Sequence, residues 1–298
     1  MAAQERVIGV DLGGTKILAG LVGPDGDLGR RREWPTPVDS QDSLLAALDA
    51  AVDDLRDPGV AALGFSIPSV IDQRAGRALS SVNVPLHDLE LRARMEARFD
   101  LPVGLDNDAN AAAFAEWRVG AGAESTTMVM LTLGTGVGGG FVLDGQLYRG
   151  WAEAGHMVVV HDGKPCACGG RGHVESYCTG VAAGEAAQEV FGPAADAHRL
   201  VRLANEGDGQ AVEILAGIGR VLGSAIGSLV NLFDAERVVI GGGFGTAAFA
   251  HLSEAALEVA CREALPPADE SLSIAKAELG TAAGVIGAGL IGFEALNG

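Results

Sequence analysis

The sequence predicts an α/β protein built from two domains of similar plan. The first 120 residues alternate strand-like and helix-like segments, and a strand, Gly/Thr turn, strand pattern at 7–22 recurs at 127–148. The chain has 298 residues, of which 48% are hydrophobic, so it can bury a sizeable core. Its 44 glycines follow no regular period and therefore indicate many tight turns.

The N-terminal half gives a clear order of elements. VIGVDLG (7–13) reads as a strand that ends in a glycine turn, and 16–22 as a second strand. Ser40 or Asp42 would cap a helix that runs to Leu55 with its leucines on one face. The next expected elements are a strand at 60–69, a helix at 89–99, a strand at 101–105 and a helix at 108–119.

The C-terminal half contains one segment long enough to span a bilayer, at 214–233. Arg220 lies in its middle and Asn231 near its end, which favours a helix packed inside the protein. A third strand with a glycine turn follows at 237–245, and the chain ends in a glycine-rich helix at 282–296.

The net charge of −18 argues against nucleic-acid and acidic-membrane partners. The opening MAAQERVIGV lacks the features of a secretory signal, so the expected location is the cytoplasm. An anionic ligand is still compatible with this charge, because backbone amides and a lysine can form a local positive pocket.

The glycine turns suggest phosphate binding. Residues 11–16, DLGGTK, combine backbone amides with an acid, a hydroxyl and a cation. Gly134, Gly136 and Gly139 match G-x-G-x-x-G, but a strand follows them, whereas a dinucleotide-binding fold requires a helix. Each turn taken alone also fits a plain hairpin.

The cysteines suggest a metal site. Cys166, Cys168 and His173 lie within eight residues, and His156 or His161 upstream would complete a tetrahedral zinc site. The alternative is a solvent-facing loop whose two reduced thiols bind no metal. Cys178 and Cys261 have no partner at ligand spacing and read as core residues.

Two acids and two amides lie within five positions at 106–110, DNDAN, where a strand should end and a helix begin. The cluster is either a site or a capped, solvated turn.

Together, D-x-G-G-T-K (11–16), N-D-A-N (107–110), E-x-G-H (153–156) and C-x-C-G-x-x-G-x-x-E (166–175) resemble the ROK family of sugar kinases and repressors, nearest to the bacterial glucokinases. The resemblance implies an actin-like ATPase fold of ribonuclease-H type, with two α/β domains around a cleft. The expected small domain is 1–112 plus 284–298, and the large domain is 113–283 with a zinc loop at 156–175.

The resemblance also assigns residues. The catalytic base would be Asp108. The sugar would be held by Asn107, Glu153, His156 and Glu175, together with Asn83 and Ser69. The nucleotide would be bound by Asp11, Gly13, Gly14, Thr15, Lys16, Gly134, Thr135, Gly136, Gly242 and Gly243. Zinc would be bound by His156, Cys166, Cys168 and His173. Two positions depart from the family pattern: His173 replaces its third zinc cysteine, and Ser69 stands where many members have glycine.

The implied activity is transfer of phosphate from ATP to the 6-hydroxyl of a hexose, with D-glucose as the first choice and with Mg²⁺ and a structural Zn²⁺ as cofactors. The alternatives are kinases for fructose, mannose, N-acetylmannosamine or N-acetylglucosamine, and a non-catalytic sugar sensor. The sensor is disfavoured because the chain opens directly on a strand, without a helix-turn-helix. The resemblance further implies a homodimer or homotetramer that acts in glycolysis and has no nucleic-acid or membrane partner.

Overall fold

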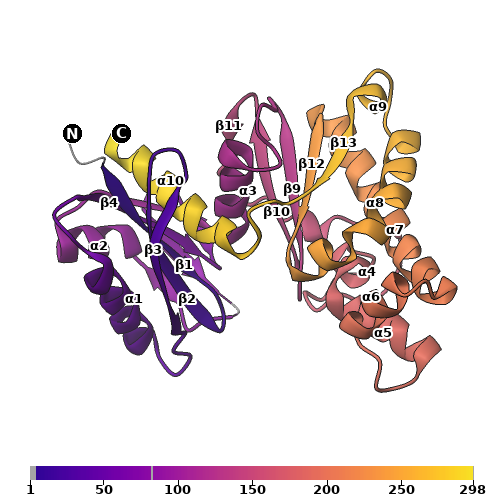
Figure 1. Ribbon diagram of the computed structural model, residues 1–298, viewed down its shortest axis with the longest axis horizontal. Coiled ribbons are helices and arrows are strands. Elements are labelled where there is room, and N and C mark those ends of the chain that lie inside the picture. The colour runs from indigo at the N-terminus through magenta and orange to yellow at the C-terminus, as the bar shows by residue number, and fades with distance from the viewer. Residues whose placement is uncertain (1–4, 82, 298) are drawn as a thin grey trace. The chain divides into compact units, whose positions relative to one another are not determined.

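The structure, a computed structural model, describes residues 5–81 and 83–297 (Figure 1). The chain divides into two compact units. The first comprises Met1–Gly120, Arg149–Trp151 and Thr281–Gly298, and the second comprises Ala121–Tyr148 and Ala152–Gly280.

The first unit is built on a five-stranded sheet in which β1 lies at the centre. The strand order is β3 (Leu28–Pro35), β2 (Lys16–Val22), β1 (Arg6–Leu12), β4 (Val60–Ile67) and β8 (Val103–Asn107). β1 runs antiparallel to β2 and parallel to β4, and β8 runs parallel to β4. A small second sheet contains β5 (Val70–Asp72), β6 (Arg77–Ser80) and β7 (His87–Leu89).

Apolar side chains on alternate β1 residues pack against α1 (Gln41–Leu55) and α2 (Leu91–Phe99). Ile8 and Val10 share a buried core with Leu44 and Leu48 of α1. The predicted cap at Ser40 is confirmed, because its hydroxyl accepts the backbone N–H of Ser43. The helices α3 (Asp108–Val119) and α10 (Ala283–Asn297) pack against each other, and α10 also packs on β1, β4 and β8.

A row of glycines lets α10 approach this sheet closely. Gly9, Gly64 and Gly104 occupy paired positions on three adjacent strands. A Cβ atom at Gly64 would lie 1.7 Å from the carbonyl oxygen of Ala288, so no larger residue fits there. The backbone of α10 can therefore lie directly against the backbone of the sheet.

The sheet of the second unit repeats the plan of the first. Its order is β11 (Gln146–Leu147), β10 (Val137–Leu143), β9 (Met128–Leu133), β12 (Arg237–Gly241) and β13 (Ser273–Lys276), with an antiparallel hairpin followed by parallel strands. The internal repeat is thereby confirmed. A strand, not a helix, follows the turn at 134–136, as predicted.

The helices of the second unit are α4 (Glu175–Cys178), α5 (Gly180–Phe191), α6 (Ala197–Asn205), α7 (Gly209–Phe233), α8 (Gly243–Glu263) and α9 (Ala268–Ser271), with 3₁₀ turns η1 (Ala154–His156) and η2 (Gly280–Ala282). By length and composition, α7 passes as a membrane span, although half of its most apolar window is buried. Gly219, Gly223 and Gly227 bring it against α8, where a Cβ at Gly219 would lie 2.4 Å from the oxygen of Leu252. This contact supports a packed core helix.

The division between the units differs from the expected boundary at 112/113. That boundary falls inside α3, which is continuous to Val119 and packs against α10 in the first unit. Residues 113–120, 149–151 and 281–283 therefore belong to the first unit.

Candidate active site

The four polar residues at 106–110 have different environments at the corner between β8 and α3. Asp106 and Asn110 are buried, Asn107 is half-buried, and Asp108 alone is exposed. Asn107 caps α3, because its Oδ1 accepts the N–H groups of Ala109 at 2.9 Å and Asn110 at 3.4 Å. The capped-turn reading of this stretch is therefore confirmed, and the stretch also presents one carboxylate outward.

Asp108 is the first residue of α3, where the helix dipole favours a negative charge. Its Oδ1 accepts the N–H of Ala109 at 2.9 Å. The amide of Asn107 donates to the carbonyl oxygen of Ser69 at 3.2 Å and so ties the corner to the turn after β4. An exposed, oriented carboxylate of this kind can accept a proton from a bound hydroxyl group.

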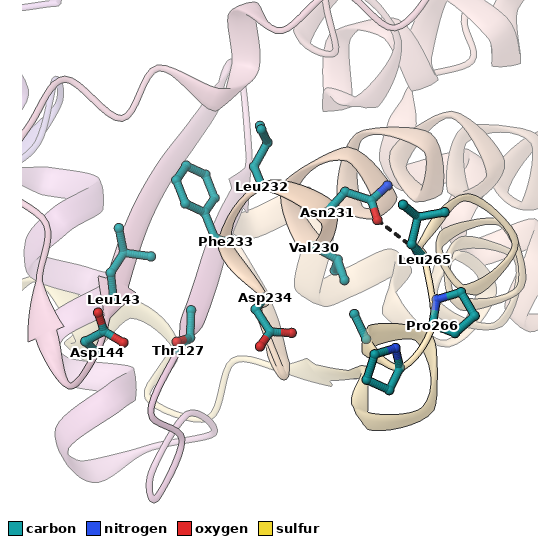
Figure 2. Close-up of a pocket in the computed structure, with 12 residues that line it drawn as sticks. Thr127, Leu143, Asp144, Val230, Asn231, Leu232, Phe233, Asp234, Leu265 and Pro266 are labelled. Atoms are coloured by element: carbon teal, nitrogen blue, oxygen red, sulfur yellow. Dashed lines mark hydrogen bonds between the residues drawn. The ribbon is translucent and has the colours of Figure 1, made fainter.

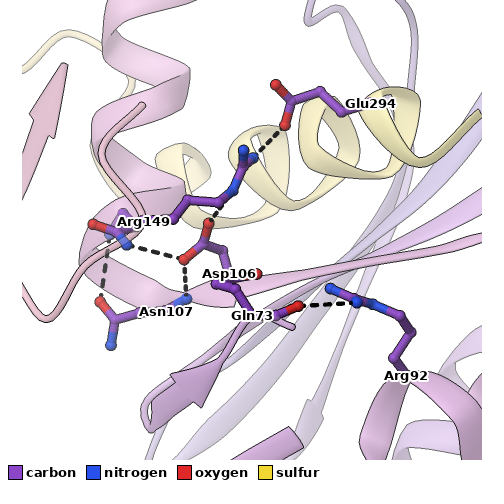
Figure 3. Close-up of polar contacts among 7 residues, drawn as sticks. Gln73, Arg92, Asp106, Asn107, Arg149 and Glu294 are labelled. Atoms are coloured by element: carbon purple, nitrogen blue, oxygen red, sulfur yellow. Dashed lines mark hydrogen bonds and ion pairs between the residues drawn. The ribbon is translucent and has the colours of Figure 1, made fainter. Parts of the chain in front are cut away.

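Asp106 was not singled out by sequence reasoning, and neither were its ion-pair partner Arg149 and the second carboxylate on that arginine, Glu294 (Figure 3). Asp106 Oδ2 accepts Arg149 Nε at 3.0 Å, and Arg149 Nη2 donates to Glu294 of α10. Burial raises the pKa of Asp106, while hydrogen bonds from Asn110 and Asn107 and the charge of Arg149 limit that rise. Asp106 could have been suspected from its place at the end of a buried strand, but Arg149, 43 positions away, gives no sequence signal.

Asp11 lies at the end of β1, beside the first glycine turn. Ser66 Oγ, on the paired position of β4, donates to Asp11 Oδ1 at 2.7 Å. Burial raises the pKa of Asp11 to about 6, the Ser66 hydrogen bond opposes this, and the nearby charge of Asp108 adds to it. The two acids thus lie close enough to influence each other's charge.

The remaining residues of the first turn form a hairpin end. Gly13 N–H donates to the carbonyl oxygen of Lys16, and Thr36 Oγ1 donates to the oxygen of Gly13 at 2.7 Å. Asn83 lies beside Gly14, since a Cβ at Gly14 would be 3.5 Å from the Asn83 Cβ. Thr15 is exposed at the tip. Lys16, predicted to bind the nucleotide, pairs with Glu33 of β3 at 2.8 Å.

Ser69 is buried, and its hydroxyl group is committed to backbone. Its Oγ lies within hydrogen-bond distance of two carbonyl oxygens, that of Ser80 at 2.7 Å and that of Val70 at 3.0 Å, and its one proton is donated between them. In this arrangement the side chain supports the turn that holds Asn107.

In the second unit, two of the glycine turns line one pocket of about 600 Å³. Gly134 and Thr135 come from the β9–β10 turn, and Gly243 from the start of α8. The pocket is completed by Gly180, Val181, Gly184, Glu185, Gln188, Asp196, Ala197, His198, Val201, Phe244 and Ala247, which the sequence did not reveal.

Two helices begin at this pocket. Thr179 caps α5, whereas α8 follows Gly242 without a side-chain cap, so its first N–H groups are available to an anion. Gly242 has φ +78° and a Cβ there would lie 2.4 Å from the oxygen of Leu133, so this position requires glycine. Gly136 lies against Glu175, at the other end of the β9–β10 turn.

The predicted metal ligands come together in the second unit. One ligand atom from each of His156, Cys166, Cys168 and His173 lies within 4.8 Å of the others. Cys168 Sγ is 3.3 Å from His173 Nδ1, and Cys166 Sγ is 3.9 Å from His156 Nδ1. His161 lies outside the cluster, with its side chain 94% exposed. Two thiols and two imidazoles at this spacing fit tetrahedral zinc.

Glu153 and Glu175 flank this cluster in different ways. Glu153 is exposed and immediately precedes η1. This turn packs on β10, since a Cβ at Gly155 would lie 2.3 Å from the oxygen of Val137. Glu175 Oε2 accepts the N–H of Val137 at 3.0 Å, and its Oε1 lies 3.8 Å from Cys166 Sγ. Glu175 therefore connects the metal loop with the β9–β10 turn.

A different pocket, of about 580 Å³, lies near the end of α7 (Figure 2). It is lined by residues that include Leu232, Phe233 and Leu265, and Asn231 Oδ1 accepts the N–H of Leu265 at 2.8 Å. None of the predicted site residues lines it.

Known sugar kinases resemble this chain over about four fifths of its length. A glucokinase from Streptomyces coelicolor is 31% identical over 79% of this chain and 81% of its own length. An N-acetylmannosamine kinase from Escherichia fergusonii is 36% identical over 80% of this chain and 84% of its own.

Solved structures agree with this. The ROK hexokinase of Thermus thermophilus has 34% identity and a TM-score of 0.85, covering 98% of this chain and 100% of that one. A ROK glucokinase from Streptomyces griseus, solved with glucose and AMPPNP, has 31% identity and a TM-score of 0.80, covering 97% and 99%. The expected actin-like fold is thereby confirmed. Since the ROK family pattern also matches residues 7–293, the chain belongs to the ROK family, among its sugar kinases.

Proposed function

We propose that this sugar kinase transfers the γ-phosphate of ATP to the 6-hydroxyl of D-glucose. The observation that carries the proposal is Asp108, which is exposed at the N-terminus of α3 in an otherwise buried or capped polar cluster. A base for phosphoryl transfer must reach a substrate hydroxyl and stay ionised. The helix terminus favours the ionised form, and the exposure leaves the carboxylate accessible.

Asn107 positions this base and contributes to the sugar site. Its oxygen is used by the helix cap and its amide holds Ser69, so its place is fixed before sugar arrives. Asn83, beside Gly14, is the second sugar contact that we propose in this unit. Preorganised groups of this kind lower the entropic cost of the reaction.

The phosphates of ATP are assigned to the glycine turns. In the second unit, the open N-terminus of α8 at Gly242 and Gly243 offers backbone N–H groups for this purpose. Thr135 and Gly136 would add theirs from the turn that Gly134 closes through its own N–H to the oxygen of Gly136. In the first unit, Gly14 and Thr15 would do the same at the turn that Gly13 closes through its N–H to Lys16, and Asp11 would hold a water of Mg²⁺. Magnesium bound with ATP offsets charge on the phosphates. Lys16 would have to leave Glu33 to take part.

We assign zinc to His156, Cys166, Cys168 and His173. Zinc would fix the loop and hold the ring of His156. Because His156 Nδ1 faces the cluster, its Nε2 is left to donate to a sugar oxygen. Glu153, exposed beside it, would accept from a sugar hydroxyl, and Glu175 would do so with the oxygen that Val137 does not use.

Glucose is chosen because glucokinases resemble the chain over up to 95% of its length. The second candidate is N-acetylmannosamine, favoured by the 36% identity to the kinase for that sugar. From the family resemblance we also propose a cytoplasmic homodimer or homotetramer that acts at the entry to glycolysis.

A panel of glucose, fructose, mannose, N-acetylmannosamine and N-acetylglucosamine, each with ATP in an assay coupled to ADP release, tests the choice. We expect the highest kcat/KM for glucose, and phosphorus NMR should place the phosphate on the 6-oxygen. Asp108→Asn, purified in parallel, controls for contaminating kinases. A higher kcat/KM for N-acetylmannosamine would establish the second candidate instead.

A further inference from the structure

Arg149 contacts Asp106, the residue that precedes Asn107 and Asp108 at the β8–α3 corner. Its Nε donates to Asp106 at 3.0 Å and its Nη2 hydrogen-bonds to Glu294, so it bridges two carboxylates (Figure 3). The Asp106 side chain is 1% exposed and that of Arg149 is 35% exposed. A carboxylate buried to this degree is costly unless a cation and hydrogen bonds compensate it.

The Asp106 carboxylate holds the chain on both sides of Asp108. Its Oδ1 accepts the backbone N–H of Asn107 at 2.8 Å and Asn110 Nδ2 at 2.9 Å. Asp108 stands between these two residues, so one carboxylate fixes both the residue before it and the first helical turn after it. Arg149 takes the other oxygen and thereby sets the rotation of the carboxylate.

Arg149 reaches this position from a remote part of the sequence. The segment Arg149–Trp151 belongs to the first unit, whereas the residues on either side of it belong to the second. Only Ala152 separates the segment from Glu153, which opens the E-A-G-H motif. Arg149 therefore joins the β8–α3 corner from a segment that is remote from it in the sequence.

We propose that Arg149 is a positioning residue for phosphoryl transfer, acting through Asp106 on the corner that presents Asn107 and Asp108. The inference rests on the roles proposed above for those two residues. Without Arg149, the Asp106 carboxylate would lose its only cation among the described residues and one of its three anchors. A shift of about 1 Å at a reacting group costs on the order of 10²-fold in rate.

The test compares Arg149→Met with Arg94→Met. Arg94 of α2 forms a similar two-point ion pair with Asp49 of α1, with both distances 2.7 Å, in the same unit but away from the corner. For each variant, kcat and KM for the sugar used by the wild type, and Tm, are measured. We expect kcat of Arg149→Met to fall on the order of 10²-fold, more than KM rises. Arg94→Met should lower only Tm.

Two further variants keep the test decisive if Arg149→Met folds poorly. Asp106→Asn keeps an amide oxygen that can accept from Asn107 and Asn110. Its NH₂ group replaces the oxygen that accepts from Arg149, so that contact is lost and kcat should also fall. Arg149→Lys restores the charge without the planar fork, so its kcat should lie between those of Arg149→Met and the wild type.

The inference is overturned if Arg149→Met or Asp106→Asn keeps the wild-type kcat with only a lower Tm, because the ion pair would then be merely structural. The activity of the wild type alone tests the proposed function. The ratio of variant kcat to wild-type kcat tests this inference.

Discussion

Ser66 and Asp11 face each other on paired positions of β4 and β1, and the serine hydroxyl donates to the aspartate at 2.7 Å. Ser66 is fully buried, so water does not compete for this hydrogen bond. The bond stabilises the ionised carboxylate and opposes the burial that raises the pKa of Asp11 to about 6. Ser66 therefore lowers the pH at which Asp11 becomes negative, against the larger effect of burial.

This relationship predicts the acid limb of the pH profile. Asp11 is mostly ionised at pH 7 and becomes protonated as pH falls through about 6, so kcat should decline there. Ser66→Ala removes the interaction that lowers the pKa, and its acid limb should move to higher pH. Profiles of kcat from pH 5 to 9 measure the shift, with Ser125→Ala, a serine of the second unit, as the control. An unmoved limb would show that Asp11 does not govern this range.

The same shift has a consequence for stability. A carboxyl group whose folded pKa lies above its ordinary value of 3.8 favours the folded state at low pH, and that contribution is lost as pH rises from about 4 to 6. Asp11→Asn removes the buried charge, so we expect it to raise Tm at pH 8 relative to the wild type while reducing turnover. Differential scanning calorimetry at pH 8 and pH 5 compares the two proteins. A Tm gain that is as large at pH 5 as at pH 8 would contradict the assignment.

Asp108→Asn should keep sugar binding and lose turnover. General-base catalysis contributes about 10²–10⁴-fold, so kcat should fall by this factor while the sugar Kd, measured by calorimetry, stays close to that of the wild type. Asp100→Asn is the matched control, because Asp100 is exposed in the same unit and has φ 54°, which asparagine tolerates. Near-normal kcat in Asp108→Asn would reject this residue as the base.

Cys166→Ser should release zinc and weaken sugar binding, since the serine hydroxyl is a poor substitute for a thiolate ligand. Metal content is measured by mass spectrometry and KM for the sugar is measured in parallel. His161→Ala should leave both unchanged, because His161 lies outside the cluster. Wild-type protein that contains no zinc after expression in zinc-supplemented medium would refute the metal assignment.

Gly64→Ala should destabilise the first unit. The new methyl group would lie 1.7 Å from the oxygen of Ala288, so α10 must move away from the sheet. We expect a loss of about 3 kcal/mol in the free energy of unfolding, at the upper end for overpacking. Gly209→Ala, where no atom lies within 4 Å of the new Cβ, should change it far less. Urea unfolding followed by circular dichroism compares the two, and equal losses would contradict the close approach.

The sequence by itself determined the two-fold repeat, the glycine turns and the grouping of two cysteines with two histidines, apart from the choice between His156 and His161. These features arise from local patterns: alternating apolar residues, turn glycines, and cysteines and histidines a few positions apart. Their neighbours in space are largely their neighbours in the chain, so spacing alone carries the information.

Tertiary structure alone decided the separate roles within DNDAN. The sequence shows four similar polar residues, but packing buries Asp106 and Asn110, commits Asn107 to the helix cap and leaves Asp108 exposed. It also brought Arg149 to Asp106 and Ser66 to Asp11, and it paired Lys16 with Glu33. Burial and long-range charge pairing depend on which distant segments meet, and no periodicity of a single sequence encodes that information.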